Sequence, residues 1–350
     1  MERAAYRIVD ANFNRAREAA RVIEEYCRFA LNSQALSQRA RQLRHELSAA
    51  VGRLDAGRLI SSRDTLGDVG IGGKVNQQLE RLSLDDCFTA GCKRLTEALR
   101  AIAEVTRTEE QSAAQAVENL RYDAYTLEKD IVLFSRAAEK FRRVELYVIV
   151  TSNLPAEVIS LTTKCVAGAA DCIQLRAKGI NDDSLFALAV EFVQICRRGG
   201  ALSIINDRVD VAVASGADGV HLGQHDMPVE QARKLQLAPL VIGRSTHCVK
   251  ELNAASRELP TYVSLGPVFA TPTKPAVEVA GLEYVKQGTK RLADTGIGHV
   301  AIGGITPDNV QEVLRAGAER IAVCSAVANA SDPAAVCRAL RDQIESFKQE

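Results

Sequence analysis

The sequence predicts an α/β fold: a (β/α)8 TIM barrel preceded by an all-helical segment. Eight short apolar runs recur after residue 143, and each is followed by a helical pattern. About 200 residues contain all eight, the usual size of such a barrel. Before residue 143 the sequence has helical periodicity and few β-branched runs. We therefore expect a helical domain over residues 1–143 and a barrel over 144–350, with an open doubly wound sheet as the alternative fold for the second part.

The predicted strands read as nearly continuous apolar runs because short parallel strands are buried on both faces. The eight runs are ELYVIVT, CIQLRAK, LSIIND, DGVHLG, PLVIGRST, TYVSLGPVFAT, HVAIGGIT and RIAVCSAV. Helical patterns such as PAEVISLTTKCVAG and TPDNVQEVLRAGA lie between them. This regular alternation predicts βα units and hence a parallel sheet.

The composition excludes some classes of partner. Lysine plus arginine equals aspartate plus glutamate at 44 each, so no overall charge favours nucleic acid or an anionic membrane. No run of about 18 apolar residues could span a bilayer. The nine cysteines form no CxxC pair and no signal peptide precedes them, which predicts reduced thiols and a cytoplasmic location.

Two aspartates follow consecutive predicted strands, Asp207 after LSIIN and Asp226 after DGVHLG. The carboxyl ends of barrel strands meet at one rim, where active sites of this fold gather. Paired carboxylates suit Mg²⁺, especially when a substrate adds phosphate oxygens. Capping of the following helices is the alternative role. His221 and His225 lie on a strand and its loop rather than on a helix, so we do not expect them to bind zinc.

The second predicted strand ends with Gln174, Arg176 and Lys178 at alternate positions, which places their side chains on one face. In a barrel this face is the interior. Cations buried there need an anionic partner, and a bound phosphate or diphosphate would supply it. Internal carboxylates are the alternative partners.

Other predicted strand ends add polar groups. The loop GPVFATPTKPAV carries Thr271, Thr273 and Lys274, and GRSTH offers the Ser245 hydroxyl, whereas we expect a structural role for His247. The runs AIGGIT and VCSA lie where barrels of this kind often hold a phosphate on backbone N–H groups. Carboxylates for a metal, cations for a diphosphate and a separate phosphate site together predict a transferase that displaces pyrophosphate with a second phosphorylated substrate.

The motifs QLRAK, IINDR, GADGVHLGQHD, GRSTH, GPVFATPTK, AIGGIT and CSA closely resemble thiamine phosphate synthases, and the resemblance covers residues 144 to about 345. Members of this family join a hydroxymethylpyrimidine diphosphate to a thiazole phosphate, releasing pyrophosphate. The C–O bond is thought to break first, so no general base is needed. A related thiazole tautomerase is the alternative, but it does not keep the aspartate pair.

The resemblance also implies site residues. Asp207 and Asp226 would hold Mg²⁺, and Arg176, Lys178 and Lys274 would be catalytic. The residues implied for the pyrimidine diphosphate are Gln174, Leu175, Arg176, Ala177, Lys178, Asn206, Ser245 and Lys274. Those implied for the thiazole phosphate are Thr271, Pro272, Thr273, Gly304, Cys324 and Ser325. Cys324 departs from the apolar residue that we would expect there, which is harmless if its backbone makes the contact.

The amino-terminal segment contains an internal repeat, NRAREAARVIEEYCRF from residue 14 and KRLTEALRAIAEVTRT from residue 93. The repeat pairs Arg15 with Arg94, Glu18 with Glu97, Arg21 with Arg100, Glu25 with Glu104 and Arg28 with Arg107. A solvated ladder of ion pairs explains this pattern. However, 20 of the 24 basic residues in 1–143 are arginine, which suits phosphate contacts.

Between the repeats, SSRDTLGDVG places Arg63, Asp64 and Asp68 in a loop, where they could meet a phosphorylated ligand and a metal. This half resembles the helical domain joined to some thiamine phosphate synthases, for which a hydroxymethylpyrimidine phosphate kinase role has been proposed. A dimerisation or regulatory module, with the chain as a homo-oligomer, is the alternative.

Overall fold

The computed structural model describes residues 2–69, 80–108, 110–236, 238–271 and 278–349. The chain forms two compact units, Met1–Val132 and Leu133–Glu350. The last helix of the amino-terminal half, α5 (Gln111–Arg142), continues past this division, and the predicted domain boundary at residue 143 lies at its end.

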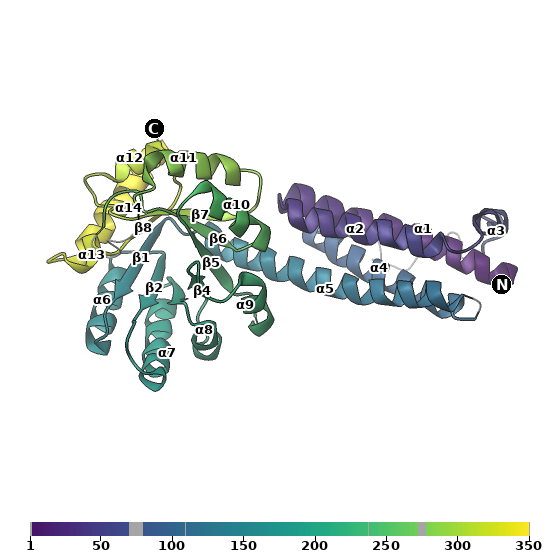
Figure 1. Cartoon of the computed structure of the whole chain (residues 1–350), viewed down its shortest axis with the longest axis horizontal. Helices are drawn as coiled ribbons and strands as arrows, with labels where there is room; N and C mark the ends of the chain where they lie inside the picture. Colours follow the sequence, from purple (N-terminus) through teal and green to yellow (C-terminus); the bar gives the residue numbers. More distant parts are fainter. Residues whose placement is uncertain (1, 70–79, 109, 237, 272–277, 350) are drawn as a thin grey trace. The chain divides into compact units, whose positions relative to one another are not determined.

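The second unit is a closed barrel of parallel strands in which each strand pairs with the next along the chain and β8 pairs with β1 (Figure 1). The strands are β1 Leu146–Thr151, β2 Cys172–Arg176, β3 Leu202–Asn206, β4 Gly219–Leu222, β5 Val241–Thr246, β6 Tyr262–Leu265, β7 Gly298–Ile302 and β8 Ile321–Val323. The eight predicted runs contain these strands apart from Gly298, so the (β/α)8 prediction is confirmed and the open sheet is wrong.

Helices follow the strands and surround the barrel (Figure 1). They are α6 Pro155–Ala167, α7 Asp182–Arg198, α8 Val209–Ser215, α9 Val229–Leu235, α10 Val249–Glu258, α11 Gly281–Leu292, α12 Val310–Arg315, α13 Ser325–Ala328 and α14 Pro333–Gln349. Outward-facing strand residues such as Val148, Leu175 and Val220 pack against helix residues in the main core. This layer fixes the barrel on which the strand-end loops are mounted.

A second core fills the interior of the barrel at the end opposite the carboxyl ends of the strands. Inward-facing strand residues, among them Tyr147, Ile204 and Tyr262, pack there with Phe141 from the end of α5. The Phe141 and Tyr262 rings stack, with centroids 4.2 Å apart and planes 7° from parallel. Apolar side chains therefore fill this end of the barrel interior.

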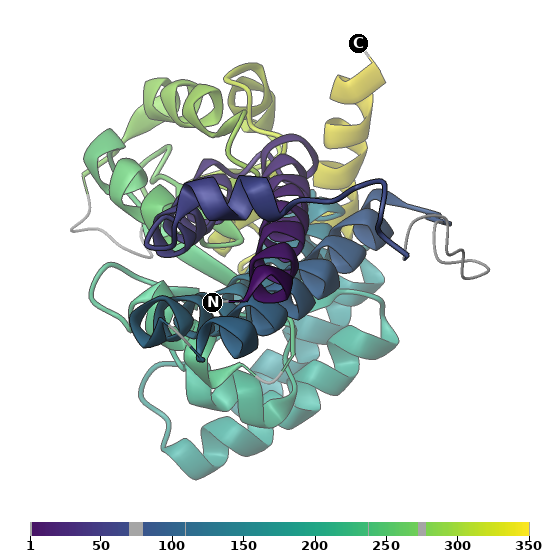
Figure 2. The ribbon, with the colours of Figure 1, turned by 90° about the vertical axis from the view of Figure 1, so that its right-hand side faces the viewer.

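The first unit is helical, as predicted, and its long helices run side by side (Figures 1 and 2). Its elements are α1 Arg3–Glu25, the π-helical turn η1 Tyr26–Ala30, α2 Gln34–Val51, α3 Ala56–Ser62, α4 Leu84–Thr106 and the first part of α5. The first copy of the repeat lies on α1 and η1, and the second begins on α4. Helices α1 and α4 pack closely: a Cβ at Gly91 would lie 3.4 Å from Cγ1 of Val22.

Within the described residues, no helix is both long enough and apolar enough to cross a lipid bilayer.

Candidate active site

A pocket of about 100 Å³ opens at the carboxyl ends of the barrel strands. Residues from all eight strands line it, together with residues that follow β5, β6, β7 and β8. The predicted site residues that the pocket brings together are Gln174, Arg176, Asn206, Ser245, Thr271, Gly304, Cys324 and Ser325.

The two predicted metal ligands lie beside each other at this rim. Asp207 has a left-handed backbone (φ 63°), and its N–H donates to the His221 carbonyl at 2.9 Å. Asp226 accepts a hydrogen bond from the Gly223 N–H at 2.6 Å. The helices that follow begin after Arg208 and Pro228, neither with a side-chain cap, so the aspartates do not have the alternative capping role.

The carboxylates influence each other's charge. Burial and the neighbouring Asp207 raise the pKa of Asp226, although the Gly223 N–H acts against this. Burial also opposes ionisation of Asp207, but hydrogen bonds from Asp226 and Lys178 outweigh it and hold the Asp207 pKa below its ordinary value. Of the two neighbouring carboxylates, Asp226 is therefore the harder to ionise.

Lys178 supplies the only salt bridge to this carboxylate pair within the described residues: its Nζ lies 2.9 Å from Oδ2 of Asp207. Internal carboxylates as cation partners were the alternative to a phosphate, and for Lys178 that pairing is present here. Arg176 lines the pocket itself. The two cations therefore lie at the carboxyl end of β2, on the same rim of the barrel as the two aspartates that follow β3 and β4.

A chain of hydrogen bonds links two pocket residues, Gln174 and Ser245, through the buried core. Nε2 of Gln174 donates to the Tyr147 hydroxyl at 2.7 Å, and this hydroxyl lies 2.9 Å from that of Tyr262. The Tyr262 hydroxyl lies 2.9 Å from Nδ1 of His221, whose Nε2 is 2.9 Å from Oγ of Ser245. We call these five residues the polar relay.

The donors in the polar relay follow from the need to place each proton. The amide nitrogen of Gln174 can only donate, so the Tyr147 hydroxyl accepts there, and among the described contacts the Tyr262 oxygen is what remains to accept the Tyr147 proton. Tyr147, which accepts from Gln174, donates to Tyr262, and Tyr262 donates to Nδ1 of His221. The proton of His221 is then on Nε2 and points to Ser245. Ser245 accepts this bond, so its own O–H is available to donate to a ligand in the pocket.

Glycines shape the opposite wall. Gly303 and Gly304 have positive φ angles of 108° and 64°. A Cβ on Gly304 would lie 2.7 Å from the Ala270 carbonyl oxygen, so only glycine allows this close approach. Asn309 holds the loop by donating to the Gly304 carbonyl at 2.9 Å. The turn therefore keeps backbone groups at the pocket surface.

Some predicted residues lie elsewhere. Leu175 is 1 % exposed and packs between barrel and helices, so only its backbone could reach a ligand. Ala177 packs partly against the same core. Three further predicted residues, Pro272, Thr273 and Lys274, lie outside the described residues.

Sequence reasoning missed the polar relay. Tyr147 and Tyr262 lie inside apolar runs and were not considered, and His221 was weighed only as a metal ligand. The alternation of side chains along a strand could have indicated the inward position of Tyr262, because Tyr262 lies two positions before the pocket residue Ser264 on β6. His247 lines the pocket, but Nδ1 lies 2.9 Å from Glu251, which agrees with the structural role expected for it.

In the helical unit, Arg63 and Asp64, which were predicted to meet a phosphorylated ligand and a metal, contact other side chains of the protein. Arg63 makes two hydrogen bonds to Asp10, at 2.8 and 2.7 Å, and Asp10 is buried. Oδ2 of Asp64 lies 3.9 Å from Arg7. Arg63 therefore has a carboxylate partner, and its role as a phosphate ligand remains a prediction.

The closed parallel barrel, with its pocket at the carboxyl ends of the strands, defines a (β/α)8-barrel enzyme. Residues 146–327 match the family described as thiamine monophosphate synthase, and residues 7–130 match the ThiD2 family. The chain belongs to the thiamine-phosphate synthase family and is a transferase.

Similar proteins cover nearly the whole chain. A thiamine-phosphate synthase of a Nostoc species is 38% identical over 351 residues, which span 100% of this chain and 97% of the relative. One from Gloeobacter violaceus is 39% identical over 95% of this chain and 94% of its own length. The structure of a thiamine phosphate pyrophosphorylase from Pyrococcus furiosus, 35% identical, matches with a TM-score of 0.54 and covers 60% of this chain and 98% of that one. These findings confirm the synthase prediction.

Proposed function

We propose that the barrel joins a hydroxymethylpyrimidine diphosphate to a thiazole phosphate by a dissociative displacement, with Mg²⁺ held by Asp207 and Asp226. One observation carries this proposal. Two neighbouring carboxylates and Lys178 lie at the same strand ends as a pocket lined by Gln174 and Arg176. Opposite charges placed together suit a substrate that arrives as a metal diphosphate.

The carboxylate pair fits a hard divalent cation. Its oxygen donors are those that Mg²⁺ prefers, and the raised pKa of Asp226 indicates that a nearby positive charge would be stabilising. In the described parts of the chain no group of three or more His, Cys, Asp and Glu could hold a metal, so the remaining ligands would come from the diphosphate and water. When bound, the ion would neutralise charge on the diphosphate.

The protein's own residues would assist the departure of pyrophosphate. Arg176 and Lys178 attract the negative charge that grows on the leaving group as the C–O bond breaks. The bonding electron pair leaves with pyrophosphate, and the nitrogen lone pair of the thiazole then forms the new C–N bond. This nitrogen carries no proton, so the step needs no general base. Lys274 stays a predicted third cation.

Ser245 and the turn at Gly304 would position the two substrates. The polar relay leaves the Ser245 O–H available to donate to the pyrimidine or its diphosphate. Gly304, Cys324 and Ser325 line the other side of the pocket, where backbone N–H groups suit the thiazole phosphate.

The metal assignment is tested with Asp207→Asn and Asp226→Asn, which keep shape and remove charge. We expect each variant to lose roughly 100-fold or more in turnover at limiting Mg²⁺, an effect on the scale of losing one main transition-state contact. Asp218→Asn is the control: this carboxylate, just before β4 at the closed end of the barrel, accepts from Ser203 at 2.9 Å. Unchanged Mg²⁺ dependence in both rim variants, with melting curves that show intact folds, would refute the assignment.

We infer that the helical unit phosphorylates the pyrimidine monophosphate, as its resemblance suggested, and the match to the ThiD2 family supports this. Incubation of the full chain with ATP, Mg²⁺ and the monophosphate should yield the diphosphate, and Asp64→Ala should abolish this conversion without altering the synthase reaction. If no diphosphate forms and Asp64→Ala instead changes the oligomeric state, the unit is an assembly module.

A further inference from the structure

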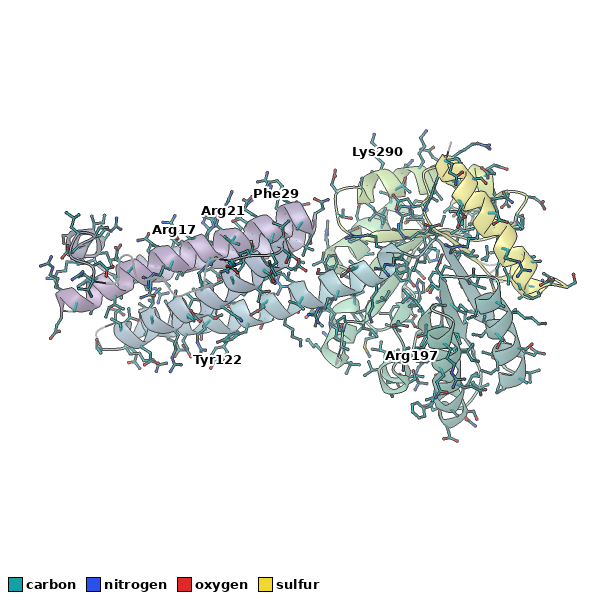
Figure 3. All side chains as sticks on the ribbon, turned by 180° about the vertical axis from the view of Figure 1, so that it is seen from behind. Arg17, Arg21, Phe29, Tyr122, Arg197 and Lys290 are labelled. Carbon is teal, nitrogen blue, oxygen red and sulfur yellow. The ribbon has the colours of Figure 1, made fainter. Side chains whose placement is uncertain are left out.

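The helical unit has an arginine-lined pocket that the synthase reaction does not use. Five residues of α1 and α2 line this pocket, whose volume is about 420 Å³: Asn14, Arg17, Glu18, Arg21 and Arg44. Figure 3 shows Arg17 and Arg21 along α1. We propose that this arginine pocket binds the phosphate group of a small phosphorylated molecule.

A buried carboxylate orients the arginines. Glu24 is fully buried, and Oε2 accepts two hydrogen bonds from Arg44, at 3.2 and 3.1 Å. Its Oε1 accepts from Arg41 at 2.9 Å and from Arg21 at 3.4 Å. These bonds hold the planar guanidinium groups before any ligand arrives, so less conformational entropy is lost on binding.

The internal carboxylates do not use all the donors that the arginines offer. A guanidinium has five N–H donors, and Arg44 uses two of them on Glu24. Arg17 makes no hydrogen bond or ion pair with any described residue; its guanidinium lies 5.4 Å from the centroid of the Phe13 ring. An anion with several oxygen acceptors would complement both groups.

Comparison with the repeat separates this pocket from the ion-pair ladder. Arg21 and its counterpart Arg100 both pair with a glutamate one turn later, at 2.5 and 2.8 Å, so the ladder accounts for these two arginines. Arg17 and Glu24, however, correspond in the second copy to Thr96 and Ala103.

Thr96 and Ala103 are both buried in α4 and carry no charge. The unpaired guanidinium and the buried carboxylate therefore belong to the first copy alone, and the repeated pattern does not account for them. Arg17 and Glu24 are seven residues apart and so lie on the same side of α1, which is the side that faces the pocket.

The other lining residues indicate what else the ligand carries. Glu18 makes no hydrogen bond or ion pair with a described residue and lines the same pocket as Arg17. A carboxylate there can only accept, so it would suit an amino or hydroxyl group of the ligand. The pocket is open to solvent, and its volume leaves room for a small molecule. The inference does not require the proposed kinase reaction, since binding could occur without phosphate transfer.

Arginine-specific labelling of the full chain with phenylglyoxal, read residue by residue by mass spectrometry, tests the proposal. Inorganic phosphate and pyrophosphate should slow modification of Arg17 roughly threefold at twice the dissociation constant. Arg197 on the barrel, whose guanidinium donates to the Gly216 carbonyl, is the internal reference and should not change. Equal protection of the two arginines, or equal protection by sulfate as an adventitious ion only, would overturn the proposal.

A matched pair of variants completes the test. Arg21→Gln should remove the protection of Arg17, whereas Arg100→Gln removes the equivalent ladder pair and should leave that protection intact. Both arginines are about half exposed, so similar folding is expected, and melting curves check it. Because this experiment measures binding at Arg17, the absence of kinase activity would not contradict the proposal. If both variants behave alike, the arginines act only in the ladder and the proposal is wrong.

Discussion

The hydroxyl of Tyr262 lies 2.9 Å from Nδ1 of His221, and this contact joins the closed end of the barrel to its open end. Below it, Tyr262 stacks on Phe141 in the apolar core. Above it, His221 contacts Ser245 at the pocket. A side chain that is wholly buried therefore determines which way a pocket hydroxyl can donate.

Tyr262→Phe should reduce synthase activity more than it reduces stability. The ring can still stack on Phe141, but Nδ1 of His221 loses its donor, so the orientation of the Ser245 proton is no longer fixed. Loss of hydrogen bonds within a buried network costs about 1 to 3 kcal/mol, and we expect kcat/KM to fall roughly tenfold. Steady-state kinetics and thermal melts would measure the two effects.

Tyr284→Phe is the matched control for this prediction. The Tyr284 hydroxyl is also buried and donates to Thr246 at 2.6 Å, but Thr246 does not line the pocket. We expect a similar loss of stability with little change in kcat/KM. Equal activity losses in the two variants would show that the polar relay has no special influence on Ser245.

Gly243→Ala should disrupt the contact between Tyr262 and His221, because the added methyl group would meet both side chains. An added Cβ would lie 2.6 Å from Nδ1 of His221 and would also collide with the Tyr262 ring, so the ring must move. Overpacking of a core costs about 1 to 3 kcal/mol. We expect a lower melting temperature and a loss of synthase activity.

Gly57→Ala, in the exposed first turn of α3, is a control for adding a methyl group. Its Cβ would lie 3.2 Å from an oxygen of Asp55 and would meet no core residue. Its activity should stay normal. Normal activity in Gly243→Ala as well would mean that the core adapts and that the position of Tyr262 is not critical.

The barrel and much of its site could be predicted because both depend on local patterns. Continuous apolar runs predict buried parallel strands, and a charge at the end of such a run, as at Asp207, predicts a rim position. The pocket confirms the proximity of Gln174, Arg176 and Ser245, which come from different strands. Their roles with substrate stay predictions.

Contacts across the barrel could not be predicted in the same way. Tyr147 and Tyr262 are 115 residues apart, and each reads as an ordinary core aromatic. Their meeting depends on the strand register and on the space left by Gly243. The partnership of Arg63 with Asp10, 53 residues away, was likewise beyond the local pattern, which suggested a free cation on a loop.

The stability of the barrel should fall as the pH falls through the range where unfolded histidine titrates, because His299 is buried on β7. Burial, together with nearby Arg320, lowers the pKa of His299 from 6.5 to about 4, and Nε2 accepts the Glu319 N–H at 3.1 Å. The unfolded chain binds a proton first on acidification, so the contribution of His299 to stability is complete above pH 6.5 and is lost toward pH 4. Between pH 8 and pH 5 the loss should be about 2 kcal/mol. Pulse proteolysis in urea would measure the free energy of unfolding of the barrel, with the fragments identified by mass. His299→Gln is the comparison, because glutamine can accept the Glu319 N–H without taking up a proton. The difference in pH dependence between the two proteins is the readout, and parallel curves would show that His299 is not the group responsible.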